Sequence, residues 1–188
     1  DGDGTPNSSD PDPSDPCLDD GTAGDEDLSN PIWADADCDG DGVTNGDEVD
    51  PDGNGTDDGN GTDPLNECDY VVADVTIPIT SGADCDGDGV TDQDEIDPNN
   101  DGDTSDQNTD PTDPCDYVIA DITVVITAGV DCDGDGLTDQ EEVDPNNDGD
   151  PSDQTSDPTD PCDPGTTTGD LSNPIWADAD CDGDGVTN

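Results

Sequence analysis

The chain of 188 residues contains no lysine, arginine, histidine, methionine or phenylalanine. Its 56 acidic residues therefore give a formal net charge of -56, and no side chain of the protein can neutralise them. Because phosphate binding depends on cationic side chains, we expect no nucleic-acid partner. General acid and base catalysis usually needs groups with separated pKa values in a dry cleft, so a chain without histidine or lysine is not expected to be an enzyme.

Apolar side chains are also scarce, at 24% of the residues, with aromatic ones at 2%. Such a chain has too little apolar area to offset its conformational entropy, so composition alone predicts an intrinsically disordered acidic polymer. No apolar run approaches the length of a membrane-spanning helix, and we expect no membrane-spanning segment. If the chain is to fold, an external cation must balance the carboxylates, and metal binding then supplies folding free energy.

The chain is rich in one motif, Asp-Cys-Asp-Gly-Asp-Gly, which occurs four times. Each copy opens a twelve-residue pattern typical of calcium loops, with oxygen ligands at positions 1, 3, 5, 7, 9 and 12 and glycine at position 6. We name these the first loop (37–48), the second loop (84–95), the third loop (131–142) and the fourth loop (180–188), which reaches position 9. The predicted calcium ligands are Asp37, Asp39, Asp41, Val43, Asn45 and Glu48; Asp84, Asp86, Asp88, Val90, Asp92 and Glu95; Asp131, Asp133, Asp135, Leu137, Asp139 and Glu142; and Asp180, Asp182, Asp184, Val186 and Asn188.

A second acidic series follows each complete loop and fills the early positions of the same pattern, but it has no acid at position 12. Its predicted ligands are Asp50, Asp52 and Asn54; Asp97, Asn99, Asp101 and Asp103; and Asp144, Asn146, Asp148 and Asp150. We expect these second-series loops to be closed from a distance by the aspartates five residues before a cysteine, which are Asp12, Asp63, Asp110 and Asp157. The alternative is that these Asp-Pro units are only stiff, solvated linkers.

Eight regularly spaced cysteines indicate a disulfide framework in an oxidising, extracellular compartment. Two regular pairings fit the spacing. Pairing within repeats joins Cys17 to Cys38, Cys68 to Cys85, Cys115 to Cys132 and Cys162 to Cys181. Pairing between repeats joins Cys38 to Cys68, Cys85 to Cys115 and Cys132 to Cys162. We favour pairing within repeats, because the segment between those cysteines is the part that varies in sequence and length.

The cysteines also divide the chain into repeats. Residues 1–16 end a preceding repeat, 17–67, 68–114 and 115–161 form three repeats, and 162–188 start a fourth. Residues 70–80 and 117–127 alternate aliphatic and more polar side chains, which predicts short strands or hairpins. Prolines soon after each complete loop limit any helix there to about one turn. Trp33 and Trp176 are interpreted as small satellite cores, with an exposed ligand-stacking role as the alternative.

Residues 84–95 and 97–103, joined by Asp-Pro segments and bracketed by cysteines, resemble thrombospondin type 3 repeats and the related repeats of large secreted surface adhesins of Bacteroidetes-type bacteria. The resemblance covers nearly the whole chain. It implies a mostly irregular, elongated repeat rod that is stapled by several Ca²⁺ ions and disulfides and lacks a large hydrophobic core. The inserts at 70–80 and 117–127 and the cysteine inside each loop depart from the thrombospondin pattern.

Residues 27–45 recur unchanged as 170–188, which indicates a long tandem array. Because such arrays suit stalks and fibres, we expect an extracellular or cell-surface structural protein that forms the shaft of a fibre or filament by head-to-tail continuation or self-association. The alternatives are an adhesin whose repeats bind a surface or glycan, and an acidic calcium-buffering or mineral-templating protein. Candidate sites for covalent glycans are the sequons at Asn7, Asn54 and Asn60 and the threonines at 166–168.

Overall fold

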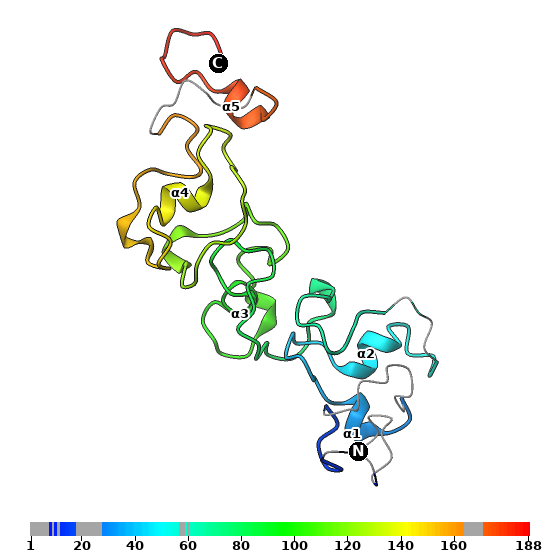
Figure 1. Cartoon of the computed structure of the whole chain (residues 1–188). Coiled ribbons are helices and arrows are strands. Elements are labelled where there is room, and N and C mark those ends of the chain that lie inside the picture. The colour runs from blue at the N-terminus through cyan, green and yellow to red at the C-terminus, as the bar shows by residue number, and fades with distance from the viewer. Residues whose placement is uncertain are drawn as a thin grey trace. The chain divides into compact units, whose positions relative to one another are not determined.

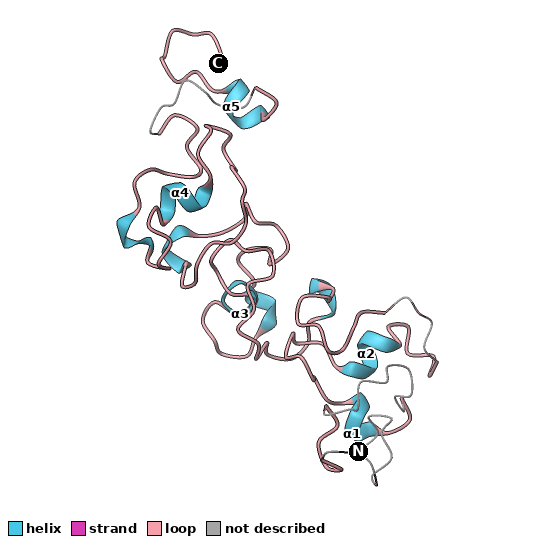
Figure 2. Cartoon of the chain, in the orientation of Figure 1, coloured by secondary structure: helices cyan, strands magenta, loops and turns pink. Residues whose placement is uncertain are grey.

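A computed structural model describes residues 8, 10, 12–17, 28–56, 59, 61–163 and 171–188. These residues form short helices joined by turns and irregular segments, and no β-strand occurs among them (Figures 1 and 2). The α-helices are α1 (Pro31–Ala34), α2 (Asn45–Val49), α3 (Asp92–Ile96), α4 (Asp139–Val143) and α5 (Pro174–Asp178). The 3-10 turns are η1 (Val72–Asp74), η2 (Thr104–Asp106), η3 (Ile119–Asp121) and η4 (Pro151–Asp153). The predicted irregular fold with single helical turns is confirmed.

The chain divides into two compact units, and each is described by itself. The first unit contains Asp1–Ala83 and Asp97–Asp106, and therefore the first loop. The second unit contains Asp84–Ile96 and Gln107–Asn188, and therefore the second, third and fourth loops. None of the described helices is long and apolar enough to span a membrane.

A threonine at position 8 of the loop starts the helix that leaves it. The Thr44 side chain accepts a hydrogen bond from the Asp47 backbone N–H at the start of α2. In α4, Thr138 forms a complete capping box with Glu141. Such caps satisfy backbone donors that the first turn leaves unpaired. The cap therefore fixes the short helix that carries the closing glutamate, Glu48 or Glu142.

The predicted strand at residues 70–80 is wrong. After the 3-10 turn η1, the segment runs along the first loop and hydrogen-bonds to its glycines. Thr76 and Ile77 donate their backbone N–H groups to Gly42 O at 3.0 and 3.2 Å. Two further N–H groups, of residues 80 and 81, donate to Gly40 O at 2.8 and 3.0 Å. Since loop carbonyls accept these bonds, no partner strand is needed. We call residues 70–81 the first insert.

The predicted strand at residues 117–127 is wrong for the same reason. The second insert, residues 117–128, lies on the second loop after the 3-10 turn η3. Its residues 123 and 124 donate to Gly89 O at 2.8 and 3.1 Å, and residues 127 and 128 donate to Gly87 O at 2.8 and 2.9 Å. In both units, therefore, the insert of one repeat docks on the calcium-type loop of the repeat before it.

Docking of the inserts builds the small cores. In the second unit Val90, Ile122, Ile126 and Val143 form a buried cluster, with Tyr117 and Ile119 packed against it. The first unit buries the corresponding Val43, Val75 and Ile79. The side chain of the aliphatic residue at loop position 7 thus packs against the following insert. This packing buries alternate residues of the insert, which explains the alternating pattern that predicted strands. Trp33 is also buried, as predicted for a satellite core.

The disulfides close within repeats. Cys17 pairs with Cys38, Cys115 with Cys132 and Cys162 with Cys181, with Cα atoms 5.2, 5.6 and 5.2 Å apart. Cys68 and Cys85 are also disulfide-bonded, and no described cysteine is free. The favoured pairing is therefore confirmed for these three bridges. Each bridge holds the start of a repeat beside position 2 of that repeat's loop.

Candidate metal sites

Each loop is shaped by its own carboxylates. In the second loop, Asp84 Oδ1 accepts the Gly87 N–H at 2.8 Å and its Oδ2 accepts the Gly89 N–H at 3.1 Å. Asp86 and Asp88 each use Oδ1 to accept the N–H two residues further on, at 3.1 and 2.8 Å. The first and third loops repeat these bonds from Asp37 and Asp131. Positions 3 and 5 therefore keep one oxygen each for another partner.

Those remaining oxygens converge. Ligand atoms of Asp84, Asp86 and Asp88 lie within 4.8 Å of one another, and so do those of Asp37, Asp39 and Asp41 in the first loop. Asp86 Oδ2 and Asp88 Oδ2 are buried without a hydrogen-bond donor. Carboxylates gathered in this way repel one another unless a cation lies between them. These clusters could hold metal ions.

The glutamates at position 12 test independently whether the loops suit a bound cation. Glu95 and Glu142 are both fully buried, at 0% exposure, and none of their carboxylate oxygens accepts a well-aligned hydrogen bond from the described residues, although the Thr109 and Ser156 side chains favour the charged forms. Glu48 is 2% exposed, and only its Oε1 is satisfied, by the Thr62 hydroxyl at 3.1 Å. An isolated buried carboxylate is strongly unfavourable unless it is paired or binds a metal. The buried glutamates therefore fit an oxygen-coordinated cation bound in each complete loop.

The pKa values of the closing glutamates also favour a cation site. Burial, and then the neighbouring Asp41 and Asp39, raise the pKa of Glu48 to about 8. Burial raises the pKa of Glu95 to about 9, and the Asp88 carboxylate contributes. Without a cation these groups hold protons near neutral pH, because the charged form is desolvated and faces like charges.

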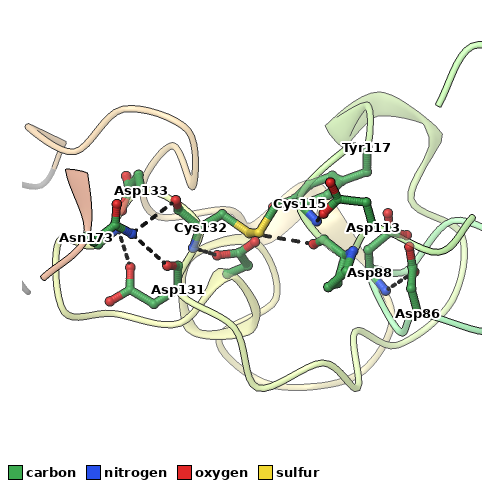
Figure 3. The surroundings of a disulfide bond; sticks show 12 residues. Asp86, Asp88, Asp113, Cys115, Tyr117, Asp131, Cys132, Asp133 and Asn173 are labelled. Carbon is green, nitrogen blue, oxygen red and sulfur yellow. Dashed lines mark hydrogen bonds between the residues drawn. A yellow bond between two sulfur atoms is a disulfide. The ribbon is translucent and has the colours of Figure 1, made fainter. Parts of the chain in front are cut away.

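Position 9 also makes a contact that the sequence did not predict. Asn45, Asp92 and Asp139 each accept the backbone N–H of the cysteine at position 2, at 3.1, 2.9 and 2.9 Å. In the third loop the Tyr117 hydroxyl donates to the other oxygen of Asp139 at 2.9 Å, beside the disulfide shown in Figure 3. Burial and the Asp139 charge raise the pKa of Tyr117. Position 9 therefore ties the loop to the disulfide, and its role as a calcium ligand stays a prediction.

The second-series loops contain a candidate ligand that is not among those predicted from the sequence. Asp106, at position 10, has a ligand oxygen within 4.8 Å of those of Asp97 and Asp101. Asn99 donates its amide N–H to Asp106 Oδ2, and Asn146 and Asp153 make the same bond. Burial and then nearby carboxylates raise the pKa of both Asp106 and Asp153. The signal was present in the sequence, because both aspartates stand at the same loop position.

The distant aspartates proposed to close these loops cap local turns. Oδ1 of Asp12, Asp63, Asp110 and Asp157 accepts the backbone N–H two residues further on, at 3.2, 3.1, 3.1 and 3.0 Å. Such turns set the chain direction just before each cysteine. A metal-binding role for these four aspartates, and for the carbonyls of Val43, Val90, Leu137 and Val186, stays a prediction. The fourth loop has the same internal bonds, with Gly185 N–H donating to Asp180 Oδ2 at 2.8 Å.

A matched pair of substitutions in α4 tests the third loop. Glu142→Gln should weaken one calcium site by about tenfold or more, since it removes a charged ligand. The same substitution should stabilise the metal-free chain, because burying glutamine requires neither proton uptake nor desolvation of a charge. Glu141→Gln is the control, since Glu141 is its exposed neighbour and glutamine can keep the capping box with Thr138. Titration calorimetry should separate the two variants, and equal affinities would contradict the site.

Calcium binding is expected to be proton-coupled. The raised pKa values, from about 6 for Asp86 to about 9 for Glu95, mean that the metal-free fold binds protons that the unfolded chain releases. The metal-free fold is therefore most stable below the ordinary pKa of 4.5 for Glu95 and loses stability as pH rises to about 9. Calcium affinity has the opposite trend and should increase from pH 6 to 9, with protons released on binding. Calorimetry in buffers of different ionisation enthalpy measures that release; a pH-independent affinity would contradict it.

Comparison with protein-family models, with curated proteins and with solved structures finds no match. The class of site is therefore defined by the residues of this chain alone: clustered carboxylates in disulfide-bonded, glycine-containing loops.

Proposed function

We propose that this chain is an extracellular structural protein whose tandem repeats bind calcium and form the shaft of a surface fibre or filament. The observation that carries the proposal is the full burial of Glu95 and Glu142 without a well-aligned hydrogen bond in a chain that has no cationic side chain. A bound cation is the simplest group that could stabilise both residues, and the fold with them.

The donor set favours calcium among the common metals. Every candidate ligand is an oxygen, because the chain has no histidine and its described cysteines are in disulfides. Hard oxygen ligands suit calcium or magnesium and do not favour zinc or copper. A loop of several carboxylates with a glutamate at position 12 is typical of calcium, which accepts more ligands and looser geometry than magnesium.

The docked inserts support a structural role. Each complete loop on which an insert docks would bind both an ion and the next repeat. Each repeat would therefore stabilise its neighbours along the array. Disulfides persist in extracellular environments, which supports a location outside the cell. The resemblance to thrombospondin type 3 repeats also supports the proposal, since it implies an elongated, mostly irregular rod that is stapled by Ca²⁺ ions and disulfides.

Small-angle X-ray scattering of the chain with and without calcium tests the proposal. With calcium we expect a stiff particle with a narrow, constant cross-section, and excess chelator should convert it to a flexible coil. Electron microscopy of a longer array should then show thin filaments of uniform width. A compact globular particle in calcium, or scattering that does not change with chelator, would contradict the proposed shaft.

A further inference from the structure

A cleft of about 530 Å³ lies between the end of the second insert and the start of α4, within the second unit. Clefts of roughly 300 to 1,000 Å³ are typical of ligand sites. The lining residues that matter for a ligand are Val125, Ile126 and Ala128 of the second insert, Gln140 and Glu141 of α4, and Asn147 of the second-series loop that follows. None of them is a candidate metal ligand, so the cleft is separate from the metal sites.

Contacts within the second unit hold the walls of the cleft in place. On the insert side, the backbone N–H groups of residues 127 and 128 donate to Gly87 O at 2.8 and 2.9 Å. On the helix side, the capping box fixes the first turn of α4. The second-series loop packs on the insert, since a Cβ on Gly149 would lie 3.3 Å from Val125 Cγ2. The cleft is therefore preformed and needs no partner to open it.

The polar side chains of the cleft offer mainly hydrogen-bond acceptors. Glu141 Oε2 accepts the Thr138 N–H and hydroxyl, each at 3.2 Å, and no donor among the described residues reaches Oε1. Gln140 uses its amide N–H to donate to Asp144 O at 2.7 Å, which leaves the amide oxygen for another partner. The Asn147 side chain makes no hydrogen bond within the described part of the chain. Three oxygens, one of them charged, therefore lie beside the aliphatic wall of the insert.

We propose that this cleft binds an alkylammonium group, the lysine side chain of a basic partner polypeptide. The aliphatic stem of lysine packs on Val125 and Ala128, and its ammonium, which has three donors and no acceptor, bonds the free oxygens. The formal charge of -56 attracts such a partner. Because these 188 residues contain no lysine or arginine, a second copy of them is not the occupant. The inference goes beyond the proposed shaft, since it gives the array a binding partner.

The size of the cleft favours a polypeptide over a free amine. A volume of about 530 Å³ exceeds that of one lysine side chain, so the residues that flank the lysine also fit. A free alkylammonium ion would fill only part of the cleft and would bury less apolar surface.

Nuclear magnetic resonance titration of the whole chain, in saturating calcium and physiological salt, tests the cleft. The probe is a blocked Gly-Lys-Gly peptide. It should shift the side-chain amide signals of Gln140 and Asn147 in a saturable way, because both line the cleft. The same peptide with norleucine in place of lysine keeps the stem but lacks the charge, and it should cause no shift. Butylammonium, which has the charge and stem without a peptide chain, should bind more weakly than the lysine peptide.

Two variants and a control separate the cleft from general attraction to the acidic chain. Glu141→Gln should weaken peptide binding by about two- to fivefold, as expected for one exposed ion pair. Asn147→Gly should also weaken it, since glycine keeps the positive φ of 59° but removes the amide. Asp121→Asn is the control, because Asp121 is an exposed acid of the same insert that does not line the cleft. It should bind the peptide like the unchanged chain.

The contrary outcomes are distinct. No saturable shift, equal binding of the norleucine peptide, or equal losses in Glu141→Gln and Asp121→Asn would overturn the cleft as a lysine site. Butylammonium binding as tightly as the peptide would overturn the assignment to a polypeptide. Calcium calorimetry of the same samples keeps the two proposals apart: a chain that binds calcium but not the peptide refutes the cleft alone, and one that binds no calcium refutes the proposed function.

Discussion

Removal of calcium by excess chelator is expected to abolish most of the ordered structure. In the second loop, Asp86, Asp88 and Glu95 present oxygens that are buried and unpaired within the described residues. Each pair of unit charges about 4 Å apart costs roughly 4 kcal/mol at an effective dielectric constant of 20. Proton uptake can relieve only part of this repulsion. Circular dichroism and limited proteolysis should show a loss of turn structure and rapid cleavage once the ions are removed.

Magnesium should restore the structure poorly, because it requires near-octahedral geometry and retains its waters. The disulfides stay intact throughout, so a chain without calcium remains cross-linked but unfolded between its bridges. Unchanged circular dichroism and protease resistance in chelator would show that calcium does not organise the chain. Equal recovery with magnesium would contradict the assignment to calcium.

The second large effect is expected from Gly89→Ala, which should release the second insert from the second loop. Gly89 has a φ of 94°, and a Cβ there would lie 2.9 Å from Ile126 Cγ1, 3.0 Å from Ile122 Cγ2 and 3.1 Å from Val124 O. The left-handed backbone costs about 1 to 2 kcal/mol for alanine, and overpacking adds about 1 to 3 kcal/mol. Urea unfolding in calcium should show the combined loss.

Gly185→Ala is the matched control for that substitution. Gly185 stands at the same position of the fourth loop with a φ of 89°, but nothing lies within 4 Å of its Cβ position. It should show only the backbone cost. Hydrogen exchange should also accelerate at the residue 123 and 124 amides in Gly89→Ala, because both donate to Gly89 O. If the two variants lose equal stability, docking of the insert contributes nothing.

The sequence predicted the features that depend on local spacing. Aspartates two residues apart around fixed glycines define the loop, and Pro51 or Pro145 ends the helix that follows it. The inserts were misinterpreted as strands because alternation of aliphatic and polar residues indicates that one face is buried. The alternation does not indicate what covers that face. Backbone carbonyls of Gly87 and Gly89 accept the bonds that a partner strand would have made, and no side-chain pattern reveals a backbone acceptor.

The closing residues of the second series were missed for a related reason. The twelve-residue pattern directs attention to position 12, whereas the turns η2 and η4 bring position 10 back toward the cluster. Asp106 and Asp153 were therefore not among the predicted ligands. Position 9 was predicted as a ligand from the loop pattern, and no side-chain pattern indicated that Asn45 and Asp139 also accept the backbone N–H of the cysteine at position 2.

The disulfide pairing decides which residues would carry tension if the chain were pulled from its ends. Cys115 and Cys132 are 17 positions apart, but their Cα atoms lie 5.6 Å from each other. Pulled straight, that stretch would span about 60 Å, so the covalent path through the sulfurs is far shorter. Force would therefore bypass the second insert and stretch the third loop with the residues after it. This bridge leaves the docked second insert unloaded and transfers the strain to the third loop, where the contacts of a bound ion with the carboxylates would be the ones to break and re-form.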